Sequence, residues 1–235
     1  MMIIKAYKAI IKNDMEKEVE NFCKAKETEV RKNYFESEKV MNINVFAFKN
    51  ELYIYIESCD DEILPQEVLS GIEEYLLMWP DGENKYFYQQ TEIFHFNQPH
   101  SNEHWKRKQN PDCCTARIAR IVPELASSYI FYHYQLQEEQ FGNGNKYGRI
   151  FIMGDTAFFY SEIPDIVEEP LCKGKLTTQN TPPSDLWQSL MEKHFVMWDD
   201  SYPKFNQNHD FKKDGYPKNC RNGQWLYIKN ILSIV

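Results

Sequence analysis

The sequence predicts an α+β fold in which two ferredoxin-like βαββαβ units pack sheet to sheet, as an intramolecular dimeric α+β barrel. Its 235 residues, 42% of them hydrophobic, suffice for one large domain or two small ones. The expected strands and helices follow the order β-α-β-β-α-β twice. The second helix of each half leads into a similar run, Met78-Trp79-Pro80-Asp81 and Met197-Trp198-Asp199-Asp200. One such unit leaves a sheet face uncovered, and two units can cover both faces.

The N-terminal half, residues 1–97, begins with alternating apolar residues and continues with a charged, helix-like stretch. Asn13-Asp14 offers an N-cap for the first helix, and Pro65 opens the second, which ends before Pro80-Asp81-Gly82. The expected elements are a strand at 3–11, a helix ending near residue 32, a hairpin of strands at 42–48 and 52–57, a helix at 65–79, and a strand at 86–96.

Residues 98–114 are polar and contain two prolines, so they are expected to form a linker. The C-terminal half, residues 115–235, repeats the order of the first. Its expected elements are a strand at 116–122, a helix after Pro123, a hairpin of strands at 149–153 and 157–163, a helix from 182 to 198, and a strand at 225–235. The long stretches 168–181 and 199–223 are expected to be lids or binding loops.

The charge balance excludes two classes of partner. Lys and Arg total 27 against 35 Asp and Glu, which gives a net charge of −8 and a pI near 5.3. Proteins that bind nucleic acid or an anionic membrane surface usually carry a basic face. No stretch approaches the roughly 18 apolar residues of a membrane span. We therefore expect a soluble cytoplasmic protein with neither kind of partner.

The six cysteines contain no CxxC pair. Scattered thiols in a chain of this length are most often reduced. The adjacent Cys113 and Cys114 could ligate a metal only with two further ligands, and His100 and His104 are not suitably spaced. We expect no metal site.

The helix after Pro123 carries the best candidates for chemistry. Tyr129 and His133 are four residues apart and therefore share one face of that helix, with Glu139 near its end. Imidazole can exchange a proton near neutral pH, and a phenol beside it can hydrogen-bond a polar ligand. The other interpretation stays open: an aromatic-rich helix is often part of a core.

Along both halves the sequence resembles the L-rhamnose mutarotases. Pro123, Tyr129, His133 and Glu139 stand in the order and spacing of that family's first helix. Similar segments are the hairpin 147–163, the tryptophan-bearing helix Leu186-Trp187-Gln188-Ser189-Leu190-Met191, the opening strand 3–7, the hairpin 44–57 and the closing strand 90–96.

The resemblance implies a cofactor-free isomerase that interconverts the α and β anomers of a rhamnose-like monosaccharide. Opening a cyclic hemiacetal requires one group to accept the anomeric proton and another to protonate the ring oxygen. His133 and Tyr129 would be catalytic. Residues expected to bind substrate are Trp187, Glu139, His95 and Arg120. Arg117 and Arg120 have opposite parity on one strand, so at most one of them faces a pocket.

The first half departs from the family, because Val19 and Cys23 occupy the positions of the helix tyrosine and histidine. We therefore expect its site to be degenerate, and the chain to be a monomeric pseudo-dimer or a homodimer. Two alternatives stay open. One is a non-catalytic protein of the same fold that binds a small molecule or sugar. The other is an oxygenase-like dimeric α+β barrel enzyme, which would use haem or an aromatic substrate.

Overall fold

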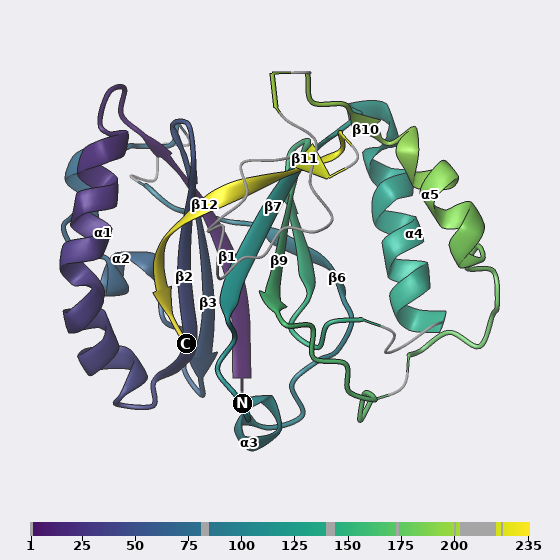
Figure 1. The fold of residues 1–235 in the computed structure, drawn as a ribbon, viewed down its shortest axis with the longest axis horizontal. Coiled ribbons are helices and arrows are strands. Elements are labelled where there is room, and N and C mark those ends of the chain that lie inside the picture. The colour runs from purple at the N-terminus through teal and green to yellow at the C-terminus, as the bar shows by residue number, and fades with distance from the viewer. Residues whose placement is uncertain are drawn as a thin grey trace. The chain divides into compact units, whose positions relative to one another are not determined.

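A computed structural model describes residues 2–80, 85–139, 144–172, 174–199, 201–202, 220–221 and 223–235. For residues 220 and 221 it describes the backbone alone. The fold is α+β with antiparallel strand pairs (Figure 1). It divides into two compact units, each assembled from separate stretches of chain. Unit 1 comprises Met1–Gln90, Pro99–Asn110 and Lys229–Val235, and unit 2 comprises Thr91–Gln98 and Pro111–Ile228.

Unit 1 is an antiparallel sheet with helix α1 against one face (Figure 1). Its strands follow the order β5-β1-β3-β2-β12, and β4 also pairs with β1. The α1 side chains Val19, Cys23 and Val30 are buried against this face. The elements are β1 (Met2–Ile11), α1 (Glu16–Val30) with a π-helical turn (Arg31–Phe35), β2 (Val40–Phe48), β3 (Glu51–Cys59), α2 (Pro65–Val68), a 3₁₀ turn (Ile72–Tyr75), β4 (Leu76–Leu77), β5 (Tyr88–Gln89), α3 (Asn102–Trp105) and the end of β12 (Trp225–Ile234).

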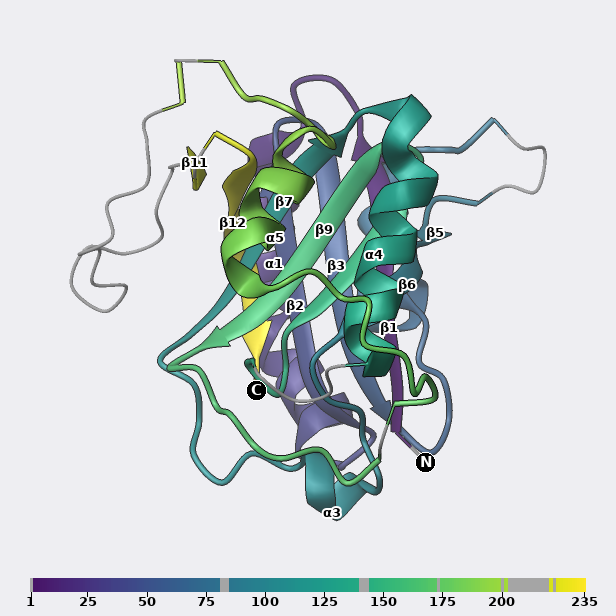
Figure 2. The same cartoon turned by 90° about the vertical axis from the view of Figure 1, so that its right-hand side faces the viewer.

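Unit 2 has the strand order β12-β7-β9-β8-β6, and helices α4 and α5 cover one face of that sheet (Figures 1 and 2). The short strand β10 also pairs with β7, and β11 pairs with β12. The elements are β6 (Thr91–His95), β7 (Cys113–Ile121), a 3₁₀ turn (Pro123–Leu125), α4 (Ala126–Glu139), β8 (Arg149–Met153), β9 (Thr156–Ile163), α5 (Ser184–Glu192), β10 (Phe195–Val196), β11 (Cys220–Arg221) and the start of β12.

The second helix of each half is shorter than expected. In unit 1 the helix expected at 65–79 ends at Val68, because Gly71 adopts a positive φ of 97° and the chain turns back to the sheet. Leu76 and Leu77 then pair with the end of β1 as strand β4. In unit 2 the helix expected to reach residue 198 ends at Glu192, and β10 pairs with the end of β7.

These two short strands occupy equivalent places in the two units. Leu76 pairs with Ile11, and Phe195 pairs with Ile121. Ile121 lies 110 residues after Ile11 in the chain. The tryptophans that follow them, in the Met-Trp run noted from the sequence, each donate an indole N–H to a backbone carbonyl, at 3.1 Å for Trp79 and 3.0 Å for Trp198.

A second repeated contact lies on β3 and β9. The Tyr55 hydroxyl donates to Glu57 and the Tyr160 hydroxyl donates to Glu162, each at 2.8 Å. Tyr55 and Tyr160 also pair with alanines 110 residues apart, Ala6 and Ala116. Equivalent side chains at equivalent register positions favour the interpretation of a duplicated unit.

The closing strands cross the expected domain boundaries. The strand expected at 86–96 is split: β5 pairs with β1 in unit 1, whereas β6 pairs with β8 in unit 2. Strand β12 is shared in the same way, since Leu226–Ile228 pair with β7 and Lys229–Ile234 pair with β2. The compact units therefore differ from the continuous segments 1–97 and 115–235.

Much of the expected linker, residues 98–114, is structured, with residues 99–110 in unit 1 and residues 111–114 in unit 2. It contains α3, the Trp105 side chain is fully buried, and β7 already begins at Cys113. The Arg107 guanidinium makes a two-pronged ion pair with Glu57 on β3, at 2.5 and 3.0 Å. The burial of Trp105 and this ion pair hold residues 101–107 against the sheet.

The helices in the described parts of the chain are all too short or too polar to cross a membrane.

Candidate functional site

Unit 2 contains a cavity of about 480 Å³ between its sheet and the helices α4 and α5. Arg117 on β7 and Phe159 on β9 lie on the faces of these strands that line the cavity. Alternate residues of a strand share one face. Aromatic side chains form a large part of its wall; six of them are Phe94, Phe159, Trp187, Phe195, Trp225 and Tyr227. At the sheet wall, the hydroxyls of Thr115 and Ser161 hydrogen-bond each other at 3.0 Å.

Tyr129 and His133 lie side by side on α4 and both line this cavity, as their four-residue spacing predicted. Their ring centroids are 4.2 Å apart. Tyr129 is fully buried and His133 is 7% exposed. The structure therefore places the two proposed catalytic residues together.

The imidazole of His133 has a defined tautomer. Its Nδ1 lies 2.9 Å from the backbone carbonyl oxygen of Tyr129, which can only accept a hydrogen bond, so Nδ1 carries the proton. Burial lowers the pKa of His133 to about 4, and the hydrogen bond to Tyr129 opposes that effect only in part. At neutral pH the ring is uncharged, and Nε2 presents a lone pair.

Tyr129 contributes a buried hydroxyl. Burial raises the pKa of this phenol, and the positive charge of Arg117 opposes the effect. Within the described part of the chain, neither the Tyr129 hydroxyl nor Nε2 of His133 has a hydrogen-bond partner.

Trp187 joins this pair from helix α5. Its ring meets the ring of His133 edge to face, with centroids 5.4 Å apart, and it lines the same cavity. Three of the six residues predicted from the sequence therefore form one wall.

Arg120 lies away from the cavity, and Arg117 takes its place. The two arginines have opposite parity on β7, as noted from the sequence. The Arg120 guanidinium lies 4.4 Å from the centre of the Trp198 ring, whereas Arg117 lines the cavity 4.4 Å from the centre of the Phe159 ring. Arg117 has the parity of Ala119 and Ile121, which pack in the apolar core beneath the helices.

Glu139 does not line the cavity; its side chain instead binds the segment that precedes α5. Its carboxylate accepts hydrogen bonds from the backbone N–H and the hydroxyl of Thr181, both at 2.6 Å, and from the Thr178 hydroxyl. Burial alone would raise the pKa of Glu139, but these bonds and one from the Asn180 backbone lower it to about 2. This residue therefore fixes the segment that leads into α5.

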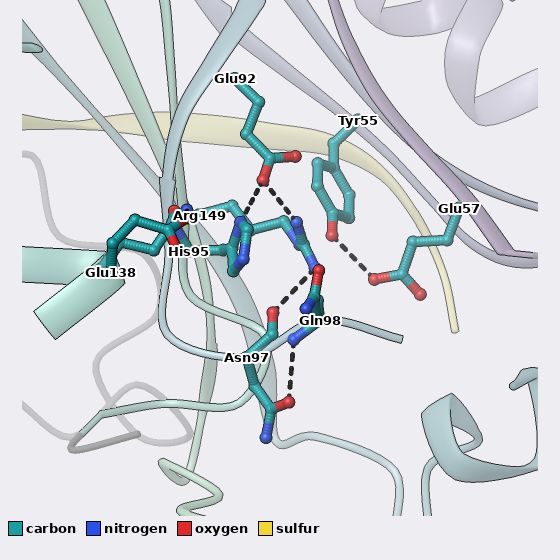
Figure 3. A network of polar contacts seen from close by, with 9 residues as sticks. Tyr55, Glu57, Glu92, His95, Asn97, Gln98, Glu138 and Arg149 are labelled. Carbon is teal, nitrogen blue, oxygen red and sulfur yellow. Dashed lines mark hydrogen bonds and ion pairs between the residues drawn. The ribbon is translucent and has the colours of Figure 1, made fainter. Parts of the chain in front are cut away.

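His95 belongs to a separate network in unit 2 (Figure 3). Its Nδ1 lies 2.6 Å from Oε1 of Glu92, which also accepts a 2.7 Å hydrogen bond from Arg149. Arg149 donates in turn to the backbone oxygen of Asn97 at 2.9 Å. Although burial alone would raise the pKa of Glu92, the charge of Arg149 and the bond with His95 hold it below its usual value.

A smaller recess of about 210 Å³ adjoins this network. His95 and Gln137 line it, together with Trp187, whose side chain also lines the large cavity. The backbone N–H of His95 donates to the Gln137 side chain at 2.9 Å, which ties β6 to α4.

In unit 1 the equivalent positions are occupied by packed side chains. Residues 110 positions before Arg117, Tyr129 and His133 are Tyr7, Val19 and Cys23. All three are buried in the apolar core of unit 1. Burial raises the pKa of Cys23 to about 12, so its thiol stays protonated.

Sequence reasoning missed Phe159, Trp225 and Tyr227, and of the two arginines on β7 it selected Arg120 instead of Arg117. The alternation of Trp225 and Tyr227 on the last strand, and of Phe159 and Ser161 on β9, is the signal that could have found them. Among the described residues, no three or more His, Cys, Asp or Glu side chains form a group that could hold a metal ion.

No protein-family model matches this chain, and no curated protein does. Two solved structures resemble it. A putative monooxygenase from Lactobacillus acidophilus NCFM aligns over 100% of this chain and 96% of its own, with 8% identity and a TM-score of 0.40. A putative monooxygenase from Fusobacterium nucleatum subsp. nucleatum aligns over 70% of this chain and 76% of its own, with 11% identity and a TM-score of 0.35.

The predicted mutarotase function is wrong. Both similar structures carry the name of a different activity, monooxygenase. The site also differs from what sugar acid–base chemistry needs. His133 has a pKa of about 4, so it is a weak base at neutral pH.

Proposed function

We propose that the cavity of unit 2 binds a flat, aromatic small molecule. The observation that carries this proposal is a ring-lined cavity of about 480 Å³, which lies within the range of roughly 300–1,000 Å³ typical of small-molecule sites. The wall combines these rings with polar side chains, among them Arg117, Asn145, Asp165 and Gln188. Polar groups in small-molecule sites fix the orientation of the ligand.

An aromatic ligand fits the wall better than an aliphatic one. The rings already meet one another edge to face, as Tyr129 does with Phe195 at a centroid distance of 5.6 Å and His133 with Trp187. A flat ring entering the cavity could extend this arrangement, and each good aromatic contact adds about 0.5–1.5 kcal/mol beyond the burial of its area.

Arg117, a cationic side chain in the wall, supports the same ligand class. Its guanidinium lies 4.4 Å from the centre of the Phe159 ring and 5.4 Å from that of Tyr227. Guanidinium groups stack on aromatic faces and donate in a fixed planar geometry. A ring compound with an oxygen substituent suits both properties.

The remaining expectations about fold and location belong to this proposal. We propose that each of the two units is ferredoxin-like, supported by its strand order, in which the first and third strands lie at the centre. The cytoplasmic location, the oxygenase-like alternative and the monomeric or dimeric state stay predictions.

Calorimetric titration and thermal shift with a matched panel test the binding function. The panel contains naphthalene, 2-naphthol, cyclohexanol and monosaccharides. The two bicyclic aromatic compounds are expected to bind and raise the melting temperature, because a ligand that binds only the folded state stabilises it. The saturated ring and the sugars are expected to bind much more weakly.

A variant at the cavity mouth provides the matched control. Gln188 is exposed and lines the cavity, whereas the neighbouring exposed Ser189 does not. Gln188→Trp is expected to weaken aromatic binding at least tenfold by filling the mouth, while Ser189→Trp should bind as the unmodified protein does. Absence of aromatic binding, or equal binding by both variants, would show that the proposed function is wrong.

A further inference from the structure

We propose that this cavity selects ring compounds that carry a hydroxyl group, and that one ligand hydroxyl bonds both Nε2 of His133 and the hydroxyl of Tyr129. The inference rests on the proposed function and specifies the chemistry of its ligand. It is carried by the buried, unpartnered hydroxyl of Tyr129 and by Nε2 of the buried residue His133, one turn apart on α4 and both in residues of the cavity wall.

The tautomer of His133 determines which ligand groups it can receive. The Tyr129 carbonyl, 2.9 Å from Nδ1, fixes the proton on that nitrogen. Nε2 of a neutral imidazole is then an acceptor only. It can bind an O–H or N–H of a ligand, and it repels an ether oxygen, a carbonyl oxygen or a carboxylate.

The Tyr129 hydroxyl complements this acceptor. A phenol both donates and accepts, and this one has no partner within the described part of the chain. The ring centroids of Tyr129 and His133 lie 4.2 Å apart, so their polar atoms belong to the same part of the wall. One ligand hydroxyl can donate to Nε2 and accept from the tyrosine, which satisfies both atoms at once.

The cost of leaving the Tyr129 hydroxyl unpaired, together with the loss of water from Nε2 of His133 when a ligand covers it, makes the selection strong. A buried polar group without a partner is expensive, and a ligand that lacks the matching group leaves that cost in place. The ring faces of Phe94 and Trp187, which meet His133 at centroid distances of 5.5 and 5.4 Å, offer it no hydrogen bond of ordinary strength. Ligands without a donor should therefore bind more weakly than their greater hydrophobicity would predict.

Three bicyclic compounds of similar shape test the inference by calorimetric titration: 2-naphthol, naphthalene and 2-methoxynaphthalene. The unmodified protein is expected to bind 2-naphthol about tenfold or more tightly than either of the others. Naphthalene is the more hydrophobic compound, so burial alone would give the opposite order.

Two variants locate the selection. His133→Phe keeps an aromatic ring and is expected to abolish the preference for 2-naphthol over naphthalene. Tyr129→Phe removes only the hydroxyl and is expected to reduce the preference by several-fold. Glu124→Gln, on the exposed 3₁₀ turn before α4, should retain it. If circular dichroism shows that His133→Phe does not fold, Tyr129→Phe alone decides the outcome.

The possible failures are distinguishable. If all three compounds bind the unmodified protein equally, the hydroxyl selection is wrong while the aromatic site stands. If the preference exists but survives in both variants that fold, the two residues do not cause it and the inference is wrong. If none of the compounds binds, the proposed function itself fails.

Discussion

Nδ1 of His133 lies 2.9 Å from the backbone carbonyl oxygen of Tyr129, and the rings of the two residues have their centroids 4.2 Å apart. One helical turn thus supplies both the hydrogen bond that fixes the tautomer of the histidine and the phenol beside it. The same burial that keeps His133 neutral makes the stability of the protein depend on pH.

We expect the free energy of unfolding to fall as the pH drops from about 6.5 to about 4. The unfolded histidine binds a proton near its ordinary pKa of 6.5, whereas folded His133 does so only at about 4. Between these values the unfolded state holds more protons, so stability is fully present above pH 6.5 and is lost as the pH falls. The effect of His133 is about 3 kcal/mol.

Urea denaturation at several pH values between 4 and 7 measures this dependence. His133→Phe should show a shallower decline than the unmodified protein. Burial also lowers the pKa of His194, which contributes with the same sign in both proteins. Because the charge of His194 helps to lower the pKa of His133, the difference between the two curves includes the repulsion between these two residues. Parallel curves would contradict the assignment of a neutral, buried His133.

The buried ion pair of unit 1 predicts a large effect on stability. Glu57 is fully buried, and Arg107 is the cation that holds its pKa below the usual value against the effect of burial. Arg107→Met leaves this carboxylate uncompensated and should cost about 3–5 kcal/mol. Lys24→Met breaks an exposed pair with Glu20, at 2.7 Å, and should cost less than about 1 kcal/mol. Equal losses in urea denaturation would refute the structural role of Arg107.

The sequence predicts the long strands and first helices well because their periodicity is local. It fails at the helix expected over 65–79 for an instructive reason. Val68, Leu69, Ile72 and Leu76 recur at helical spacing and all are buried, yet the helix ends at Val68. The apolar spacing correctly indicated which of these side chains are buried. The backbone conformation of the segment was determined instead by the left-handed conformation of Gly71 and by strand pairing with β1.

Partners of the closing strands could not be predicted from periodicity. Strand β12 pairs with β7 through its first residues and with β2 through its last, and nothing in its own alternation marks the change at residue 229. Pairing at a sheet edge depends on residues more than a hundred positions away.

The residues of the candidate site could be predicted from the sequence on helix α4 but not on strand β7. Four-residue spacing placed Tyr129 and His133 together. Strand β7 is buried on both faces, with Ala116 and Ile118 on one and Ala119 and Ile121 on the other. Its sequence therefore gives no alternation to show that Arg117 faces the cavity and Arg120 does not.

Glu139 predicts a local change in dynamics. Its carboxylate binds the Thr181 backbone N–H at 2.6 Å, just before α5 begins. Glu139→Ala should increase the hydrogen-exchange rate of that amide about tenfold or more, because a charge-assisted bond is lost. Glu124→Ala, on an exposed turn, is the control and should leave the rate unchanged. Since the pKa of Glu139 is about 2, the protection should persist in the unmodified protein down to about pH 3.

Tyr129→Phe is expected to stabilise the free protein by about 1 kcal/mol, because it removes a buried hydroxyl that has no partner among the described residues. Tyr160→Phe is the matched control: that hydroxyl is equally buried but donates to Glu162 at 2.8 Å, so its loss should destabilise by about 1–2 kcal/mol. Urea denaturation measures both changes. Opposite signs would show that the Tyr129 hydroxyl is retained at a cost in stability, as functional groups often are. A loss of stability in both variants would mean that the Tyr129 hydroxyl supports the fold.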